Sequence, residues 1–236
     1  MSWISSCRIR KILVALSIGL TAGCAQVEYR QATHDDKNND MPFERIVNYD
    51  IGTNFYRTPP RCVVVLPSPI NQIGVSRAKI IETALARQLT FRVQRVIGPD
   101  ERDRLIRDLA LDLDTSSGRQ RFSNLARCDT AIVITISGFE TTFAVVWASA
   151  SLSLSTRMIR LQDDVELWQA AHSASRSDGT APISPASIPV GLFSAGRFIG
   201  DRDMFPSMVD DTVRRLLTSL PDLRTPNGSR LAGKKF

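Results

Sequence analysis

The residues with the greatest capacity for chemistry in this chain are four cysteines, Cys7, Cys24, Cys62 and Cys128. A cysteine thiolate is a nucleophile, a metal ligand or one half of a disulfide, depending on its surroundings. Cys24 follows a run of small residues at 21–23, whereas Cys62 and Cys128 stand at or just before β-branched segments. The main candidate chemistry is therefore that of thiols. Whether these cysteines form disulfides or stay reduced depends on the compartment that the chain reaches.

The first 24 residues indicate that compartment. Three basic residues open the segment: Arg8, Arg10 and Lys11. The apolar run Ile12–Leu20 is long enough for a signal peptide and too short to span a bilayer. Residues 20–24, Leu-Thr-Ala-Gly-Cys, resemble a bacterial lipobox. The resemblance implies a lipoprotein signal peptide over 1–23, a diacylglycerol on the Cys24 thiol and an N-acyl chain such as palmitate on its new amino group. The alternative is an ordinary secretory signal cleaved near Ala22, which would leave Cys24 as a free thiol.

The residue after Cys24 and the charge of the mature chain indicate where the protein acts. Ala25 stands where an Asp would favour the inner membrane, so the lipobox resemblance implies the periplasmic face of the outer membrane. The alternative is the outer leaflet of the inner membrane. Residues 1–23 hold three of the 30 basic residues and no acid, so 27 basic residues face 24 acidic ones, a net charge of +3. No basic stripe with interleaved aromatics remains, which argues against nucleic acid as a partner.

Cys62 and Cys128 are expected to form a disulfide. Each stands beside the start of a predicted strand, and the two strands are expected to be parallel neighbours, which can bring matching Cα atoms within disulfide range. An oxidising compartment favours the bond, and closing so long a loop would add roughly 4 kcal/mol in the chain-entropy model. The alternative is two buried thiols that act as small apolar side chains.

The remaining polar residues form no reactive constellation in the sequence. Neither His34 nor His172 has metal-ligand spacing around it, and a histidine within a strand is usually packed or solvated. Asp163 and Asp164 are adjacent in a turn, where carboxylates normally face solvent. No phosphate-binding glycine loop and no nucleophile elbow occur. We therefore expect no enzyme, no metal and no cofactor other than the covalent lipids on Cys24.

Apolar periodicity predicts an α/β domain over 61–222, preceded by a polar tether over 24–60. The expected elements are a strand at 62–66, a helix at 76–89, a strand at 91–97, helices at 99–113 and 118–126, and a strand at 130–136. This alternation is typical of a parallel sheet, and right-handed crossovers place the first strand between the other two. Three aromatic residues would let part of the tether dock on the domain: Tyr49, Phe55 and Tyr56.

The second half of the domain has a different pattern. Residues 145–161 alternate apolar and polar side chains, as an antiparallel strand does, and 165–175 return as its hairpin partner. A C-terminal helix is expected over 206–219, ahead of a basic, disordered tail at 223–236. Residues 178–200 are interpreted as a long apolar loop, typical of a segment that covers a sheet edge or contacts a partner. Its candidate contact residues are Ile188, Val190, Leu192, Phe193 and Ile199.

Three segments together resemble a known group of envelope proteins. They are VVVLP at 63–67, DTAIVITI at 129–136 and the hairpin RMIRLQDDVELWQA at 157–170. With the lipobox, they make the chain similar over 61–220 to the α/β lipoproteins related to the curli-pore subunit and the amino-terminal domain of TolB. The resemblance implies an α/β fold with a mixed sheet and a role in envelope assembly or export, with no catalytic motif. The hairpin turn has Asp163-Asp164 where that group commonly has a glycine.

These observations predict a lipid-anchored periplasmic lipoprotein that acts without catalysis, by contact with other envelope proteins. Self-association is one form that such contact would take. The alternative is a module that binds a small glycan or lipid fragment, in an apolar pocket at the carboxyl ends of the parallel strands, near 68–74 and 137–141. An enzyme would need a reactive cluster that only folding assembles.

Overall fold

A computed structural model of the protein describes residues 28–31, 46–69, 73–144, 147–179 and 188–224. The expected signal peptide 1–23, the lipid-attachment residue Cys24 and residues 225–236 of the tail expected over 223–236 lie outside these ranges. Leu223, the first residue of that tail, is buried in the hydrophobic core. The strands are β1 (Glu28–Gln31), β2 (Ile46–Ile51), β3 (Cys62–Val65), β4 (Arg95–Ile97), β5 (Thr130–Ala144), β6 (Trp147–Arg160) and β7 (Glu166–Gly179). The helices are α2 (Thr53–Arg57), α4 (Val75–Leu89), α5 (Pro99–Leu109), α6 (Ser116–Ala126), α7 (Ile188–Gly200) and α8 (Met204–Thr218).

The seven strands that the structure describes form one mixed sheet, in the order β1-β2-β7-β6-β5-β3-β4. β3 pairs in parallel with both β4 and β5, so it lies between them, as right-handed crossovers require. β5, β6 and β7 are antiparallel neighbours, and β2 pairs antiparallel with β7. The expected fold class is therefore confirmed: a mixed α/β sheet with a parallel β-α-β-α-β beginning, an antiparallel hairpin and a C-terminal helix.

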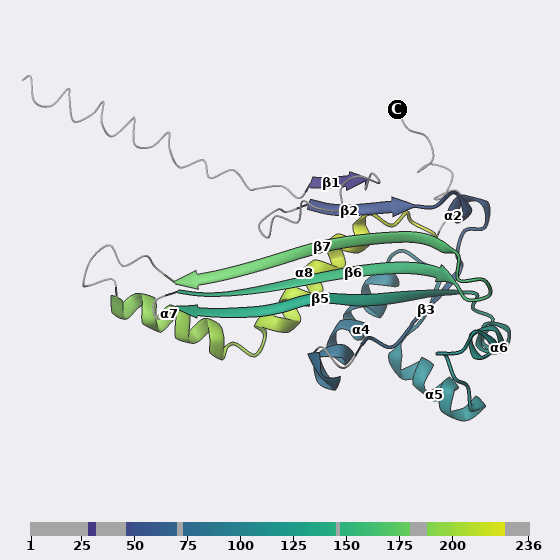
Figure 1. The fold of residues 1–236 in the computed structure, drawn as a ribbon, viewed down its shortest axis with the longest axis horizontal. Helices are drawn as coiled ribbons and strands as arrows, with labels where there is room; N and C mark the ends of the chain where they lie inside the picture. Colours follow the sequence, from purple (N-terminus) through teal and green to yellow (C-terminus); the bar gives the residue numbers. More distant parts are fainter. Residues whose placement is uncertain (1–27, 32–45, 70–72, 145–146, 180–187, 225–236) are drawn as a thin grey trace, which may run out of the picture.

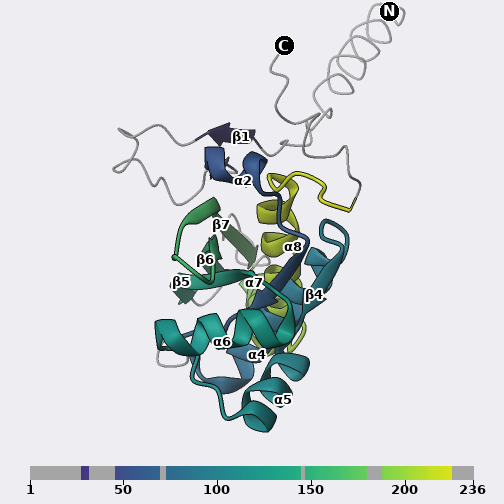
Figure 2. The ribbon, with the colours of Figure 1, turned by 90° about the vertical axis from the view of Figure 1, so that its right-hand side faces the viewer.

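Successive residues of β3 point into two separate cores, because side chains alternate across a strand. Val63 and Val65 join the larger core, which α4 and α8 cover, whereas Cys62 and Val64 join a smaller core beneath α5 and α6. Figure 2 shows α8 beside the long strands, with α5 and α6 below them. Both faces of β3 are buried, which explains why this strand is apolar throughout.

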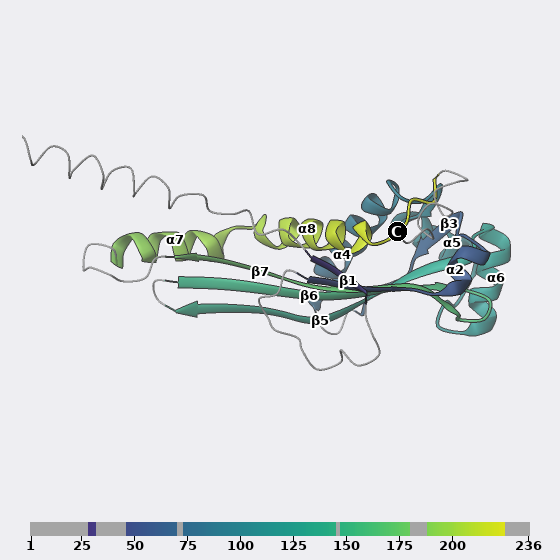
Figure 3. The same cartoon turned by 90° about the horizontal axis from the view of Figure 1, so that it is seen from above.

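β5, β6 and β7 extend beyond the rest of the sheet as a three-stranded arm (Figure 1). β3 pairs with β5 only over Thr130–Ile132, whereas β6 pairs with β5 from Thr130 to Ala144. α7 and α8 follow one another along one face of the arm (Figure 3). A bulge between Ile136 and Gly138 shifts the register of β5, and such bulges increase the local twist of a sheet.

The tether expected over 24–60 is not polar chain throughout. Ile46–Ile51 forms β2 beside β7, with the Val47 side chain fully buried. α2 then buries Phe55 completely and Tyr49 packs against the larger core, so two of the three aromatic residues dock on the domain, whereas Tyr56 is exposed. The physical reason is that the N–H and C=O groups of β7 over Trp168–His172 would otherwise lack strand partners, which β2 supplies.

Two other expected elements differ from the structure. Residues 188–200, interpreted as part of a long loop, form helix α7, with Pro189 in its first turn, where a missing N–H removes no helical hydrogen bond. The strand expected over 91–97 is limited to Arg95–Ile97, because the chain after α4 first forms a hydrogen-bonded turn.

The turn between β6 and β7 has an aspartate at the position that favours glycine. Asp164 has a φ of 55°, in the left-handed region. Its backbone N–H donates to the Arg160 carbonyl at 2.9 Å, and its carboxylate accepts from the Arg119 guanidinium at 2.7 Å. The contact with Arg119 on α6 therefore offsets part of the backbone strain and holds the hairpin against that helix.

Candidate interaction surface

The cysteines at the amino-terminal ends of β3 and β5 form a disulfide, Cys62–Cys128, with Cα atoms 5.1 Å apart. Both residues are buried in the smaller core. The bond forms here because parallel neighbouring strands place their matching ends side by side, as the sequence indicated. It fixes the end of the sheet that lies opposite the free end of the arm (Figure 1).

A buried ion pair occupies the carboxyl end of β3. Glu82 Oε2 lies 2.9 Å from Arg102 Nη2, with the two side chains 7% and 4% exposed. Glu82 also accepts the backbone N–H of Ser68 at 2.7 Å, and Arg102 donates to the Val65 carbonyl at 2.8 Å. The pair thus joins α4 to α5 across the end of the strand. The ligand site expected near 68–74 falls partly outside the described residues, and Ser68 itself is buried.

His172 is buried in β7 and contacts the neighbouring strand. Its Nδ1 lies 2.8 Å from the carbonyl oxygen of Ile46, and since a carbonyl only accepts, Nδ1 donates the proton. Burial lowers the pKa of His172 below its ordinary value; the hydrogen bond to Ile46 opposes this shift, Arg215 adds to it, and Asp211 opposes it. The side chain is therefore packed, as expected, and links β7 to β2.

The outer edge of β5 is unpaired along most of its length. β3 covers this edge only as far as Ile132, with one further hydrogen bond from the Leu66 N–H to the Ile132 carbonyl at 3.0 Å. From Val133 to Ala144, the described residues supply β5 with strand pairing on the β6 side alone. The N–H and C=O groups of such an edge can pair with another chain.

Apolar side chains are exposed at the free end of the same arm. On α7, Phe193 is 67% exposed and Leu192 is 43% exposed, and Phe143 at the end of β5 is 55% exposed. Figures 1 and 3 place α7 and the end of β5 at the same end of the molecule. The structure does not describe the side chains of the other three candidate contact residues, Ile188, Val190 and Ile199. Exposed apolar side chains of this kind stabilise a complex when a partner covers them.

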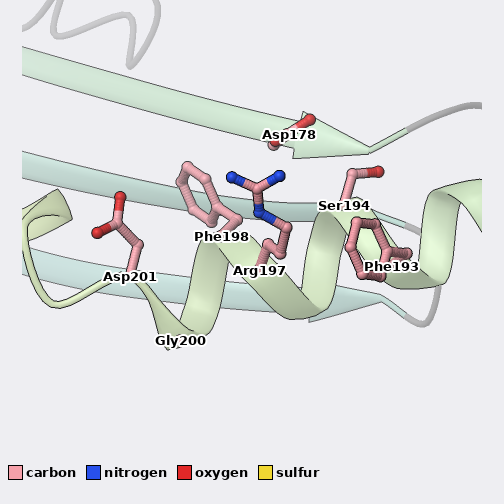
Figure 4. A pocket seen from close by; sticks show the side chains of 7 residues that line it. All are labelled: Asp178, Phe193, Ser194, Arg197, Phe198, Gly200 and Asp201. Atoms are coloured by element: carbon pink, nitrogen blue, oxygen red, sulfur yellow. The ribbon is translucent and has the colours of Figure 1, made fainter.

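A cavity of about 630 Å³ lies between α7 and the end of β7. Figure 4 shows Arg197 extending from α7 towards Asp178 on β7, with Phe193 and Phe198 on either side of it. The guanidinium carbon of Arg197 lies 5.9 Å from the centre of the Phe193 ring, a cation–π contact.

We define the interaction surface as the β5 edge from 133 to 144 together with Leu192, Phe193 and Arg197. It combines unpaired backbone groups, exposed apolar area and a positioned cation.

Sequence reasoning identified part of this surface and missed the rest. Leu192 and Phe193 were expected to contact a partner and are exposed, although on a helix rather than on a loop. The continuation of β5 beyond 136 was missed. The signal that indicates it is the run GFETTFA at 138–144, rich in the aromatic and β-branched residues that favour strands.

Among the described residues, no helix is both long enough and apolar enough to span a membrane. In the same parts of the chain, no three His, Cys, Asp or Glu side chains are grouped as ligands of a metal ion would be.

Comparison with known proteins gives structural neighbours only. No protein-family model matches the sequence, and no curated protein matches it. The fold is similar to that of lipoprotein GNA1162 from Neisseria meningitidis, with 15% identity and a TM-score of 0.41 over 60% of this chain and 99% of that one. It is similar to PelC of Paraburkholderia phytofirmans, solved as a dodecamer, with 11% identity and a TM-score of 0.43 over 76% and 97% of the two chains. A minor lipoprotein from Acinetobacter baumannii has 8% identity and a TM-score of 0.37 over 73% and 92%. The chain is thus similar, at low identity, to solved bacterial lipoproteins.

Proposed function

We propose that this chain is a lipid-anchored periplasmic lipoprotein that acts without catalysis, by contact with other envelope proteins, as an accessory of envelope assembly or export. The anchor is the acylated Cys24 of the lipobox-like segment, and the signal peptide is 1–23. The outer membrane is the proposed site, since Ala25 follows the cysteine. The lipids on Cys24 are the only non-protein groups in this proposal.

The observation that carries the contact role is the unpaired edge of β5 beside exposed apolar side chains. An edge that continues from Val133 to Ala144 offers main-chain hydrogen bonds to an added strand. Phe193 and Leu192 offer apolar area at the same end of the arm. Natural proteins usually shorten, charge or cover such an edge, so its retention here favours use in an interface.

Photocrosslinking in living cells tests the contact role. The photoreactive amino acid p-benzoylphenylalanine is placed at Glu140, on the β5 edge, or at Phe193, on α7, in the full-length protein. The control position is Arg104, an exposed residue of α5, a helix that lies away from the free end of the arm (Figure 1). The expected result is crosslinked species above the monomer mass from Glu140 and Phe193, with mass spectrometry identifying either a second copy of this chain or another envelope protein. Recovery of monomer alone from both positions, or equal crosslinking from Arg104, contradicts the proposal.

Membrane fractionation tests the anchor. A thioether-linked diacylglycerol with an N-acyl chain holds a protein to a bilayer, since each buried methylene contributes about 0.8 kcal/mol. The Cys24→Ser variant is therefore expected in the soluble fraction, while a Cys62→Ala/Cys128→Ala double variant stays with the membrane. A Cys24→Ser variant that still sediments with membranes would refute the lipid anchor.

A further inference from the structure

A second cavity, of about 450 Å³, opens between α4, β5 and the corner where α7 meets α8. Its volume is within the range of small-molecule sites, about 300–1,000 Å³. We call it the α4–α8 cleft. Most of its wall is apolar, formed chiefly by Ile80, Phe139, Phe143, Phe198, Met204 and Phe205.

One cation of the cleft is held in place by aromatic rings. The guanidinium carbon of Arg77 lies 5.0 Å from the centre of the Phe139 ring and 5.5 Å from that of Phe205. The two rings meet edge to face with centres 5.1 Å apart. A guanidinium in cation–π contact still has N–H donors that can bind a carboxylate or phosphate. Among the residues that the structure describes, Arg77 has no carboxylate partner within ion-pair distance.

The charge of the cleft is positive. Arg202 also lines it, and the ion pairs of the described residues do not include this side chain. Asp201 supplies the opposite charge, but one of its carboxylate oxygens already accepts the backbone N–H of Asp203 at 2.9 Å. Two guanidinium groups and one carboxylate therefore border an apolar wall.

We infer that the α4–α8 cleft binds an amphiphile with one aliphatic chain and an anionic head, either a carboxylate or a phosphate. The chain lies against the rings of Phe139 and Phe205, and the head accepts hydrogen bonds from Arg77 and Arg202. Each methylene that the apolar wall buries raises the affinity about fourfold, and the charge-assisted bonds select the anion. The cleft shares Phe139 and Phe143 with the β5 stretch of the interaction surface, but its ligand is bound by side chains and not by strand pairing.

Titration calorimetry with three ligands of equal chain length tests the inference. Decanoate, decyl phosphate and uncharged decyl maltoside are added, below their micelle concentrations, to the full-length chain carrying Cys24→Ser in detergent-free buffer. At least one of the two anions is expected to bind at least tenfold more tightly than the maltoside. Preference for decanoate indicates a fatty acid, and preference for decyl phosphate indicates a phospholipid-derived head. Absence of binding by both anions, or equal binding of the maltoside, overturns the proposal.

Substitutions then assign the binding to this cleft. Arg77→Gln is expected to weaken binding of the preferred anion about tenfold or more, Arg77→Lys less so, and Thr141→Trp, which fills the cleft, to abolish it. Arg104→Gln removes an exposed arginine of α5 that does not line the cleft and is expected to change nothing. Thermal unfolding checks that each variant is folded, and Arg202→Gln replaces Arg77→Gln if the latter is not. Unchanged binding in the folded arginine variants, or equal loss in Arg104→Gln, overturns the assignment.

Discussion

Glu82 and Arg102 form the most deeply buried ion pair among the described residues, with 2.9 Å between Oε2 and Nη2. Glu82 comes from α4 and Arg102 from α5, the helices that cover the two faces of β3. Glu82 also accepts the backbone N–H of Ser68, just after the strand, and Arg102 donates to the carbonyl of Val65, its last residue. Buried charges are tolerated only when paired and hydrogen-bonded. Glu82 has Arg102 as its partner, and Arg102 also pairs with Asp103, with 2.8 Å between Nη2 and Oδ1. The pair therefore couples the packing of the two helices to the conformation of the chain at Ser68.

Glu82→Gln is expected to reduce the free energy of unfolding by about 1–3 kcal/mol, because Arg102 loses its buried partner and keeps only Asp103, whose side chain is 44% exposed. Urea denaturation at neutral pH measures the change. The matched control is Lys79→Gln, which breaks the exposed pair Lys79–Asp100, whose side chains are 62% and 80% exposed, and which should cost about 0–1 kcal/mol. Equal losses in the two variants would show that the buried pair is not a stabilising contact.

Removal of the disulfide is expected to lower stability by about 2–5 kcal/mol, since Cys62 and Cys128 are 66 residues apart in the sequence. A Cys62→Ala/Cys128→Ala double variant is suitable because both residues are buried and alanine adds no polar atom. Urea denaturation of oxidised wild type against the double variant gives the difference. In a separate assay, thiol labelling of denatured, unreduced wild type should leave both cysteines unmodified, and full labelling of both would disprove the bond.

The buried His172 is expected to make stability depend on pH. Its pKa in the folded protein is lowered from 6.5 by burial, so below that pH the unfolded chain binds more protons than the folded one. Stability should therefore be highest above pH 6.5 and fall as the pH decreases through that value towards the folded pKa. Denaturant midpoints from about pH 5 to pH 8 measure this slope. His172→Gln keeps a donor for the Ile46 carbonyl but cannot titrate, and an unchanged slope in it would exclude His172 as the cause.

The turn between β6 and β7 offers a test of backbone strain against side-chain contact. Asp164→Gly and Asp164→Ala both lose the hydrogen bond to Arg119, but only glycine adopts the left-handed conformation without backbone strain. The glycine variant should therefore be the more stable of the two by about 1 kcal/mol. At the neighbouring Asp163, whose φ is not positive, glycine should give no such advantage. The opposite order at Asp164 would mean that the turn adopts another conformation in solution.

The topology of the α/β half follows from local patterns, and the arm does not. β-branched runs and helical periodicity are properties of neighbouring residues, so they predicted β3 between β4 and β5 together with the Cys62–Cys128 bond. Helix α7 was missed because glycines at 191, 196 and 200 suggest a loop when the apolar surface of the arm is not considered. β2 was missed because its six residues form a strand only when β7 is present to pair with them.

The sites show the same division. Leu192 and Phe193 could be selected because their apolar character is visible in the sequence. The cation–π contacts of Arg77 with Phe139 and Phe205 bring together α4, β5 and α8, which are distant in the sequence. The Glu82–Arg102 pair likewise has no local signature, since each residue resembles the many exposed charges around it until α4 and α5 approach each other at the carboxyl end of β3.

The disulfide encloses β3, α4, β4, α5 and α6 in one covalent ring, while the arm strands and α8 lie outside it. A protease that cuts the backbone once between Cys62 and Cys128 leaves the two fragments joined, so the nicked protein migrates as one species until a reductant is added. A cut between β5 and β6 releases the carboxyl-terminal part at once on denaturation. In a compartment that contains proteases, the α/β half therefore stays covalently connected after a single backbone cleavage, and the arm does not.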